Sequence, residues 1–341
     1  MSDEPLLVVD DLRVSFSTPD GVVRAVDGVS FTLEPGRTLG IVGESGSGKS
    51  VTASTIMGLT NSATASIEGS IRLGGKEIRG ASDEDVRRMR GSDMAMVFQD
   101  PMSALNPYYT VGRQIGEAYK VHHPGAKKAE LRDVAISMME KVGIPNPVGR
   151  SDEFPHQFSG GMRQRIVIAI ALVNNPRLLI ADEPTTALDV TVQAQILELM
   201  KSIQEEFGSA IILITHDLGV IAEVADDVAV MYAGRMVERA TAIDLFETPA
   251  HPYTWGLMGA VHSLDGSGRG SLRTIPGSPP SLIAVPSGCP FHPRCQFVDR
   301  VGSRCSEERP SLHEVPGTSS RSACHLPSET VVELLRAGVS S

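Results

Sequence analysis

The stretch GESGSGKS, residues 43–50, decides the fold of this chain. It matches the pattern G-x-x-x-x-G-K-[ST], follows the apolar run LGIV (39–42) and precedes the helix-compatible VTASTIMGL. In a strand, loop and helix of this kind, the glycines let the backbone curl so that several N–H groups and the helix N-terminus face the phosphates of a ligand. The lysine reaches the β- and γ-phosphates, and the serine reaches Mg²⁺. The motif therefore predicts binding of a nucleotide with Mg²⁺ by Gly43, Ser45, Gly46, Gly48, Lys49, Ser50 and Val51.

Three more apolar runs repeat the pattern further along the chain: MAMVF (94–98), LLIA (178–181) and IILIT (211–215). Their length and apolar continuity are typical of strands buried on both faces of a parallel sheet. Each run ends in polar residues, namely Gln99, then Asp182 with Glu183, then His216 with Asp217. Because ligands of open α/β sheets bind beyond the carboxyl ends of the strands, we expect all four strand ends to meet in one crevice.

The pair Asp182 and Glu183 suits the hydrolysis of a nucleotide. At the end of a strand, the first carboxylate can hold magnesium through water, and the second can polarise an attacking water. Most Asp-Glu pairs are only solvated loop residues, but this pair follows a predicted buried strand in a chain with a phosphate loop. His216 stays open between a catalytic and a structural role, because only its place after a strand favours catalysis.

The bulk composition describes an ordinary globular protein. The chain has 341 residues, 41% of them hydrophobic and 21% charged, so it is large enough for two domains or one domain with an extension. A net charge of −10 argues against a constitutive nucleic-acid binder. Since there is no long apolar stretch and no basic, signal-like start, we expect a cytoplasmic protein.

The segment FSGGMRQR, residues 158–165, resembles the signature motif of ABC-transporter ATPases. Ser159, Gly160 and Gly161 stand where a helix should begin, which gives a second anion-binding helix N-terminus with an N-cap hydroxyl. The resemblance implies a RecA-like P-loop core with antiparallel β and helical subdomains. It also implies a head-to-tail dimer, in which each signature closes on the nucleotide held by the other subunit.

The same resemblance implies roles for five strand-end and loop residues. Gln99 matches the glutamine that senses magnesium and contacts the membrane subunits, and Asp182 matches the magnesium aspartate. Glu183 matches the catalytic base, and Asp189 the aspartate of the loop that crosses the dimer interface. His216 matches the switch histidine that contacts the γ-phosphate, which favours its catalytic interpretation.

Two positions depart from the common pattern of that family. Phe16 stands where the adenine-stacking residue is usually tyrosine; it can stack on a base but could equally be a core residue. Met162 stands where the common signature has glutamine. Within the peptide-importer family, a methionine here resembles one of two paired ATPases, so we expect a heterodimer with unequal sites, a homodimer being the alternative.

A finer resemblance covers essentially the whole chain. It is carried by QDPMSALNP (99–107), ETPAHPYTWGL (247–257), GSPPSL (277–282) and PSGCPFHPRC (286–295), and it is to the ATP-binding subunits of dipeptide and oligopeptide importers. The resemblance implies an ATPase at the cytoplasmic face of the membrane, working with two transmembrane permease subunits and, indirectly, an extracytoplasmic peptide-binding protein. Alternatives are nickel or glutathione import within the same family, a soluble ABC ATPase acting on nucleic acid or ribosomes, and a regulatory module without hydrolysis.

We expect two domains. Residues 1–235 form the nucleotide-binding domain, with a helical subdomain at about 100–160 that includes AKKAELRDVAISMMEKVGI (126–144) and docks on membrane partners. Residues 236–341 form a C-terminal extension, where Pro, Gly and Ser become frequent and regular periodicity fades.

The extension holds all four cysteines of the chain, Cys289, Cys295, Cys305 and Cys324. Disulfides are disfavoured in a cytoplasmic protein. A zinc site lacks the usual paired C-x2-4-C spacing, whereas an iron-sulfur cluster tolerates wider spacing, so the residues alone leave these two open. The resemblance to peptide importers favours a [4Fe-4S] cluster, with a structural or redox-sensing role.

Overall fold

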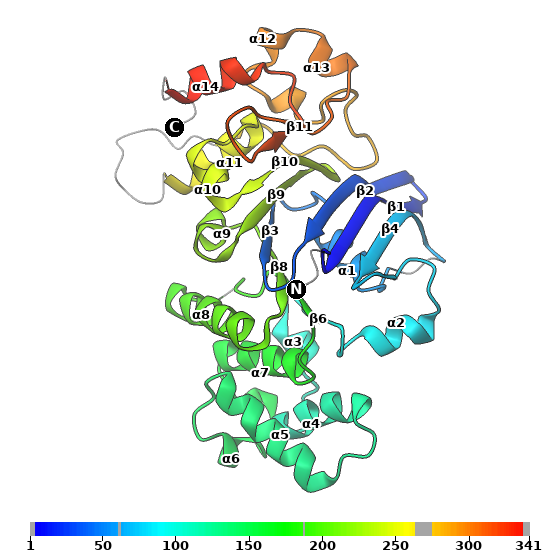
Figure 1. The fold of residues 1–341 in the computed structure, drawn as a ribbon, viewed down its shortest axis with the longest axis vertical. Helices are drawn as coiled ribbons and strands as arrows, with labels where there is room; N and C mark the ends of the chain where they lie inside the picture. The colour runs from blue at the N-terminus through cyan, green and yellow to red at the C-terminus, as the bar shows by residue number, and fades with distance from the viewer. Residues whose placement is uncertain (1–3, 61–62, 187, 263–274, 337–341) are drawn as a thin grey trace. The chain divides into compact units, whose positions relative to one another are not determined.

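A computed structural model describes residues 4–60, 63–186, 188–262 and 275–336 (Figure 1). Its backbone contacts divide the chain into two compact units. Unit 1 contains Leu33–Arg37 and Ile78–Ile214, and unit 2 contains Leu7–Thr32, Thr38–Glu77 and the residues from Thr215 onward. This division differs from the predicted boundary at 235/236, which falls within a strand, so that boundary stays a prediction.

Three of the four predicted runs are neighbouring parallel strands of unit 1. They are β6 (Met94–Val97), β7 (Leu178–Asp182) and β8 (Ala210–Thr215). Met94 pairs with Leu178, and Leu178 pairs with Ala210. Every residue of β7 and β8 is buried, as their continuous apolar sequence predicts.

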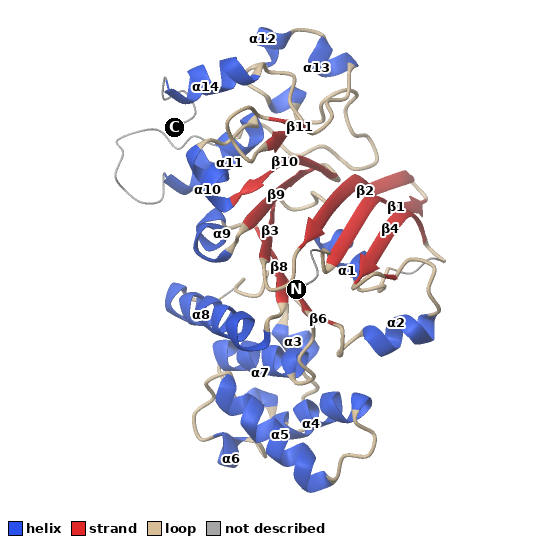
Figure 2. Cartoon of the chain, in the orientation of Figure 1, coloured by secondary structure: helices blue, strands red, loops and turns tan. Residues whose placement is uncertain are grey.

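Helices make up the rest of unit 1 (Figure 2). They are α2 (Asp83–Met89), α3 (Pro101–Ala104), α4 (Val111–His122), α5 (Lys128–Lys141), α6 (Pro147–Arg150), η1 (Pro155–Gln157), α7 (Gly160–Leu172) and α8 (Val190–Phe207). Helix α5 confirms the helical prediction for 126–144. It packs on α4 through buried apolar side chains, including Ile115 and Met139.

Unit 2 contains two groups of strands. One sheet has the order β2 (Gly21–Leu33), β1 (Leu7–Thr18), β4 (Ala65–Leu73) and β5 (Lys76–Glu77). In the other group, β11 (His313–Glu314), β12 (Arg321–Ser322), β10 (Arg235–Thr241), β9 (Asp227–Tyr232) and β3 (Thr38–Val42) are successive neighbours. Strand β3 is the fourth predicted run; it is fully buried and parallel to β9. Helix α1 (Lys49–Ile56) follows the phosphate loop.

The C-terminal part is more regular than the sequence predicts. Strand β10, α10 (Ala242–Glu247) and α11 (Pro252–His262) follow the point where periodicity was expected to fade. Later in the chain come η2 (His292–Arg294), α12 (Val298–Val301), α13 (Arg304–Glu307) and α14 (Ser328–Arg336). Helix α9 (Leu218–Val224) lies before β9 and β10 in the sequence. Part of the stretch in which Pro, Gly and Ser are frequent, residues 263–274, lies outside the described residues.

A small apolar core of its own holds the end of the chain together. Trp255 of α11 packs edge-on against Phe297, with ring centroids 5.2 Å apart, and the buried Leu326, Val331 and Leu334 complete the cluster. Within the described residues, no helix is both long enough and apolar enough to cross a membrane.

One carboxylate ties distant parts of unit 2 together. Asp27, on β2, accepts from Arg13 of β1 at 2.7 Å, from Arg235 of β10, and from Arg309 at 3.3 Å. The side chains of Asp27 and Arg235 are each only 13% exposed. Removing one partner would leave the opposite charge poorly solvated. This network should therefore contribute more to the free energy of unfolding than ion pairs on the surface do.

We expect Asp27→Ala to lower the free energy of unfolding by about 3 kcal/mol, because the mostly buried Arg235 guanidinium loses its counter-charge. Urea denaturation followed by circular dichroism measures the change. Glu308→Ala is the matched control, since it breaks a pair with Arg304 in which both side chains are more than half exposed. Equal effects of the two substitutions would contradict the central role of Asp27.

Candidate functional site

The phosphate loop has the backbone that its glycines predict. Gly43, Gly46 and Gly48 have φ values of 152°, 78° and 102°. A Cβ on Gly43 would lie 2.2 Å from the carbonyl oxygen of Met231, and one on Gly48 would lie 2.3 Å from that of Ala25. A Cβ on Gly46 would meet nothing within 4 Å. Two glycines thus permit close packing, whereas the third faces open space.

Lys49 is the first residue of α1 and is 5% exposed. Its Nζ donates to the carbonyl oxygens of Gly43 at 2.7 Å and Glu44 at 3.0 Å, so the ammonium group is held inside the curl of its own loop. Ser45, Gly46 and Ser50 are exposed, and Val51 is partly exposed. The loop therefore has exposed serines at its surface and a buried positive charge behind them, which suits a polyphosphate.

Gln99 and Glu183 meet in unit 1. The Gln99 side-chain amide donates to the Glu183 carboxylate at 2.9 Å, and the Thr186 hydroxyl donates to the same oxygen at 2.9 Å. Asp182 precedes Glu183 at the end of β7 and is 7% exposed. Two of the predicted strand ends thus converge as expected. Their convergence with the phosphate loop and His216 spans both units and remains a prediction.

Five other predicted residues lie at or beside helix starts. The Ser159 hydroxyl caps α7 by accepting from the Met162 N–H at 3.4 Å, and Gly160 and Gly161 open that helix, as predicted. Asp189 caps α8 by accepting from the Val192 N–H at 3.0 Å. His216 is exposed and lies between β8 and α9, directly before the α9 cap Asp217.

Phe16 is partly buried in β1, opposite Ala65 of β4. Its ring is therefore neither a fully buried core group nor a free surface group. Both interpretations of Phe16, as a base-stacking residue and as a structural one, stay predictions.

The sequence motifs did not reveal a clamp on the phosphate loop. Arg294 donates to both carboxylate oxygens of Glu44, at 2.6 and 3.1 Å, and to the hydroxyl of Tyr232 at 3.3 Å. The Arg294 side chain is 6% exposed. Burial lowers its pKa, but the hydrogen bonds to Glu44 and Tyr232 outweigh this and raise it above the ordinary value. The Glu44 N–H also donates to Tyr253 at 2.8 Å. Glu44 occupies one of the x positions of the motif G-x-x-x-x-G-K-[ST], at which any residue is allowed. Its contact with Arg294 can therefore be seen only in the structure.

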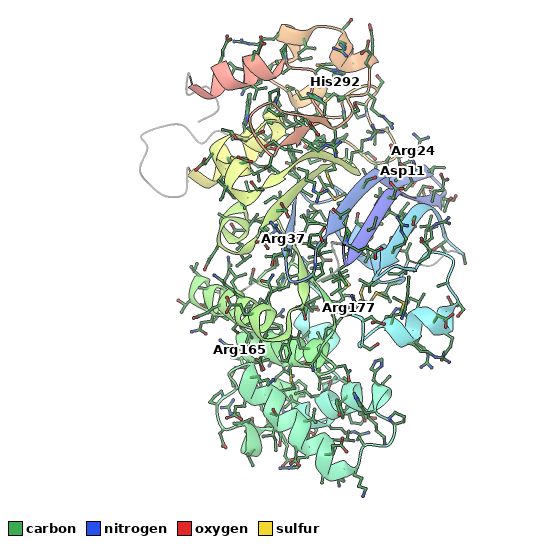
Figure 3. All side chains as sticks on the ribbon, in the orientation of Figure 1. Asp11, Arg24, Arg37, Arg165, Arg177 and His292 are labelled. Atoms are coloured by element: carbon green, nitrogen blue, oxygen red, sulfur yellow. The ribbon has the colours of Figure 1, made fainter. Side chains whose placement is uncertain are left out.

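The four cysteines line one enclosed cavity together with His251, Phe291, His292 and His325. All four are free thiols, and Figure 3 labels His292 in this region. The free volume of this cavity is small, about 10 Å³. Among the described residues, no three His, Cys, Asp or Glu side chains are grouped closely enough to hold a single metal ion.

Four free thiols around one cavity are the donor set of a zinc site as well as of an iron-sulfur cluster. A single zinc draws four sulfurs to about 2.3 Å from one centre, whereas a [4Fe-4S] cluster binds each sulfur to a different iron. Burial raises the pKa of Cys289 and Cys295 to about 11, while backbone N–H groups two residues further on act in the opposite direction. The N–H of Leu326 likewise donates to the Cys324 sulfur at 3.4 Å. Such N–H groups stabilise a thiolate, the form that binds metal.

Glu238 lies at the base of this region, fully buried in β10. Its carboxylate accepts from the N–H groups of Ala250 at 2.6 Å and His251 at 2.9 Å, and from the Thr254 hydroxyl. Burial raises the pKa of Glu238 to about 7, and these hydrogen bonds only partly oppose the shift. The Glu238 carboxyl group therefore fixes the start of α11, but its ionisation lowers the stability of the folded state.

Comparisons with known proteins agree on the family. A family model described as ABC transporter matches residues 26–186, and another, described as the C-terminal region of oligopeptide/dipeptide transporters, matches residues 237–301. The chain is 56% identical over 293 residues to the dipeptide transport ATP-binding protein DppD of Bacillus subtilis, covering 86% of this chain and 87% of the relative. It is 50% identical over 327 residues to the oligopeptide transport ATP-binding protein OppD of Salmonella typhimurium, covering 96% and 95%.

Solved structures give the same fold. A dimeric ATP-binding cassette in a post-hydrolysis state, bound to ADP and Pi, matches with a TM-score of 0.63 and 25% identity over 69% of this chain and 98% of its own. A subunit of the cbiONQ transporter complex from Clostridium perfringens matches with a TM-score of 0.61 and 27% identity, over 72% and 91%. These matches confirm the predicted ABC nucleotide-binding fold.

We expect the stability of the wild type to fall, relative to Glu238→Gln, as pH rises from about 4.5 to 7. The folded state holds the Glu238 proton up to about pH 7, whereas the unfolded chain releases it near 4.5, so the folded state binds more protons in this window. The difference between the two proteins should change by on the order of 3 kcal/mol, measured by urea denaturation at each pH. Parallel pH profiles would show that Glu238 does not titrate with folding.

Proposed function

The chain belongs to the ABC transporter family, among the ATP-binding subunits of dipeptide and oligopeptide transporters, and from this we propose that it hydrolyses ATP to power the import of short peptides. The observation that carries the proposal is the Glu183 carboxylate, fixed by Gln99 and Thr186 beside Asp182 at a strand end, in a chain with a formed phosphate loop. Nucleic acid is not a proposed partner.

In the proposed reaction, a water attacks the γ-phosphorus of ATP and the bond to the β-phosphate oxygen breaks, giving ADP and phosphate. Glu183 orients and deprotonates that water, and His216 contacts the γ-phosphate. Lys49 stabilises the charge on the β- and γ-phosphates. Ser50, Asp182 and Gln99 would hold Mg²⁺, which would supply further charge neutralisation. The buried ammonium of Lys49 supports its role, because its charge needs no reorganisation when ATP arrives.

We propose that the working unit is a dimer with a related ATPase. Ser159, Gly160, Gly161 and the exposed Asp189 would then face the nucleotide of the partner subunit. Met162 supports unequal sites: its sulfur accepts from Arg150 at 3.5 Å, but a thioether donates no hydrogen bond where the common glutamine could.

We also propose that the helical part of unit 1 docks on the two permease subunits, which keeps the ATPase peripheral at the cytoplasmic face of the membrane. A groove of about 750 Å³ runs between α4 and α5, lined by charged side chains that include Arg113, Glu117, Lys120 and Arg132. Tyr108, just before α4, is 83% exposed. Aromatic side chains are enriched at protein interfaces. The peptide-binding protein would act through the permeases.

For the cysteine cavity we propose a [4Fe-4S] cluster held by Cys289, Cys295, Cys305 and Cys324, with zinc as the alternative. Support comes from four free thiols around one cavity and from backbone N–H groups that bond the sulfurs of Cys289, Cys295 and Cys324. Bound there, the cluster would join segments from 289 to 324 that already share a small apolar core and the hydrogen bond from the Cys289 N–H to the Cys305 carbonyl oxygen at 2.8 Å.

We expect Glu183→Gln to lower ATP turnover at least a hundredfold in the complex with the partner ATPase and permeases, because the amide cannot accept the proton of the attacking water. Phosphate release measures the rate. Glu198→Gln, on the exposed face of α8, is the matched control and should keep the wild-type rate. Unchanged turnover in Glu183→Gln would remove the catalytic base and count against the proposed mechanism.

Protein purified without oxygen should contain roughly four irons and four acid-labile sulfides per chain and absorb visible light. Cys289→Ser should lose the colour, because one of four ligands is gone, whereas Ser311→Ala, an exposed serine of the same extension, should keep it. About one zinc per chain without sulfide would contradict the cluster and leave the ATPase assignment standing.

A further inference from the structure

A recess of about 440 Å³ lies beside the tip of the phosphate loop. Ser45 and Gly46 of the loop form one side, and Val23 of β2 lies next to them. The remaining wall is the segment Pro279–Ile283, more than 230 residues further along the chain. The volume falls in the range of ordinary small-molecule pockets. Because Ser45 and Gly46 line the recess, a ligand that fills it would touch the phosphate loop.

The lining of the recess suits the uncharged part of a nucleotide. Val23, Pro279, Pro280, Leu282 and Ile283 supply apolar surface, while Ser45 and Ser281 supply hydroxyl groups. Among the described residues, no charged side chain and no aromatic ring lines it. Phosphate needs cationic or N–H partners, whereas a base and ribose need apolar surface with a few hydrogen-bonding groups.

The wall is fixed in place at several points. The N–H of Arg24, a residue of β2 labelled in Figure 3, donates to the carbonyl oxygen of Leu282 at 3.2 Å. Within the segment, the N–H of Ala284 donates to the carbonyl oxygen of Ser281 at 3.0 Å, which closes a turn. The side chain of Ile283 nevertheless stays 44% exposed. The segment thus has a fixed backbone and carries an exposed apolar side chain, as a surface that contacts a ligand requires.

Arg294 joins this wall to the phosphate loop. Its guanidinium donates to the carbonyl oxygens of Pro276 at 2.8 Å and Gly277 at 3.3 Å, directly before the wall, and on its other side it holds Glu44. A single buried, planar side chain therefore sets the spacing between the two sides of the recess.

We propose that Pro279–Ile283 of the C-terminal extension forms part of the nucleotide site and contacts the adenosine part of bound ATP or ADP. The inference rests on the proposed function, since it presumes that the phosphate loop holds a nucleotide. It assigns the extension a direct part in binding of the substrate, separate from any metal held by the cysteines.

The test compares two ligands that differ only by adenosine. Binding of MgADP and of magnesium pyrophosphate to the full chain is measured by calorimetry for wild type and for Ile283→Ser. We expect Ile283→Ser to weaken ADP about three- to tenfold, because apolar contact with adenosine is lost, and to leave pyrophosphate within twofold. Ile283→Val should keep most of the ADP affinity. Val22→Ser is the matched control, since Val22 is 50% exposed on β2 but lies outside the recess.

Two results would overturn the inference. Unchanged ADP affinity in Ile283→Ser would show that the wall makes no contact with adenosine. Equal weakening of ADP and pyrophosphate would show that Ile283 acts only on the shape of the loop. If the wild-type protein binds neither MgADP nor magnesium pyrophosphate, the proposed function fails together with the inference. That result differs from one in which both ligands bind but Ile283→Ser has no effect, which overturns only the inference about the wall.

Discussion

The ion pair between Arg294 and Glu44 is the contact on which the functional parts of unit 2 depend. Its partners lie 250 residues apart, one in the phosphate loop and one between Cys289 and Cys295. A buried arginine that lost its carboxylate would carry an uncompensated charge, so the loop and the extension are held together more firmly than surface contacts could achieve. Because the same guanidinium also binds the carbonyl oxygens of Pro276 and Gly277, three segments share one anchor.

The proposed catalytic carboxylate is held in a different way. Glu183 has a φ of 50°, in the left-handed region that side chains other than glycine rarely adopt, at a cost of about 1–3 kcal/mol. Its N–H donates to the carbonyl oxygen of Ile214 at 2.9 Å, and Gln99 and Thr186 fix its side chain. The neighbouring strand β8 and the side chains of Gln99 and Thr186 thus hold Glu183 in a strained conformation, and strained residues cluster at functional sites.

Much of this arrangement could be predicted from local sequence. Strands β3, β6, β7 and β8, the capped start of α7 and the curl of the phosphate loop follow from short patterns with a direct physical cause. Gln99 and Glu183 could be expected to meet because both follow neighbouring parallel strands. The clamp by Arg294 and the wall at Pro279–Ile283 could not, because no periodicity or motif encodes a contact across 230 or more residues. Regular structure after residue 236 was likewise missed, since prolines and glycines there mark turns between short elements.

The long separation of Arg294 from Glu44 also has a consequence for the newly made protein. Ribosomes add about 5–20 residues per second, so roughly 12 to 50 seconds pass between synthesis of Glu44 and synthesis of its partner. Throughout that interval the growing chain carries a phosphate loop whose glutamate has no counter-charge from Arg294. The nucleotide site is therefore among the last parts of unit 2 to be completed during translation, and a chain released early would carry the motif without its clamp.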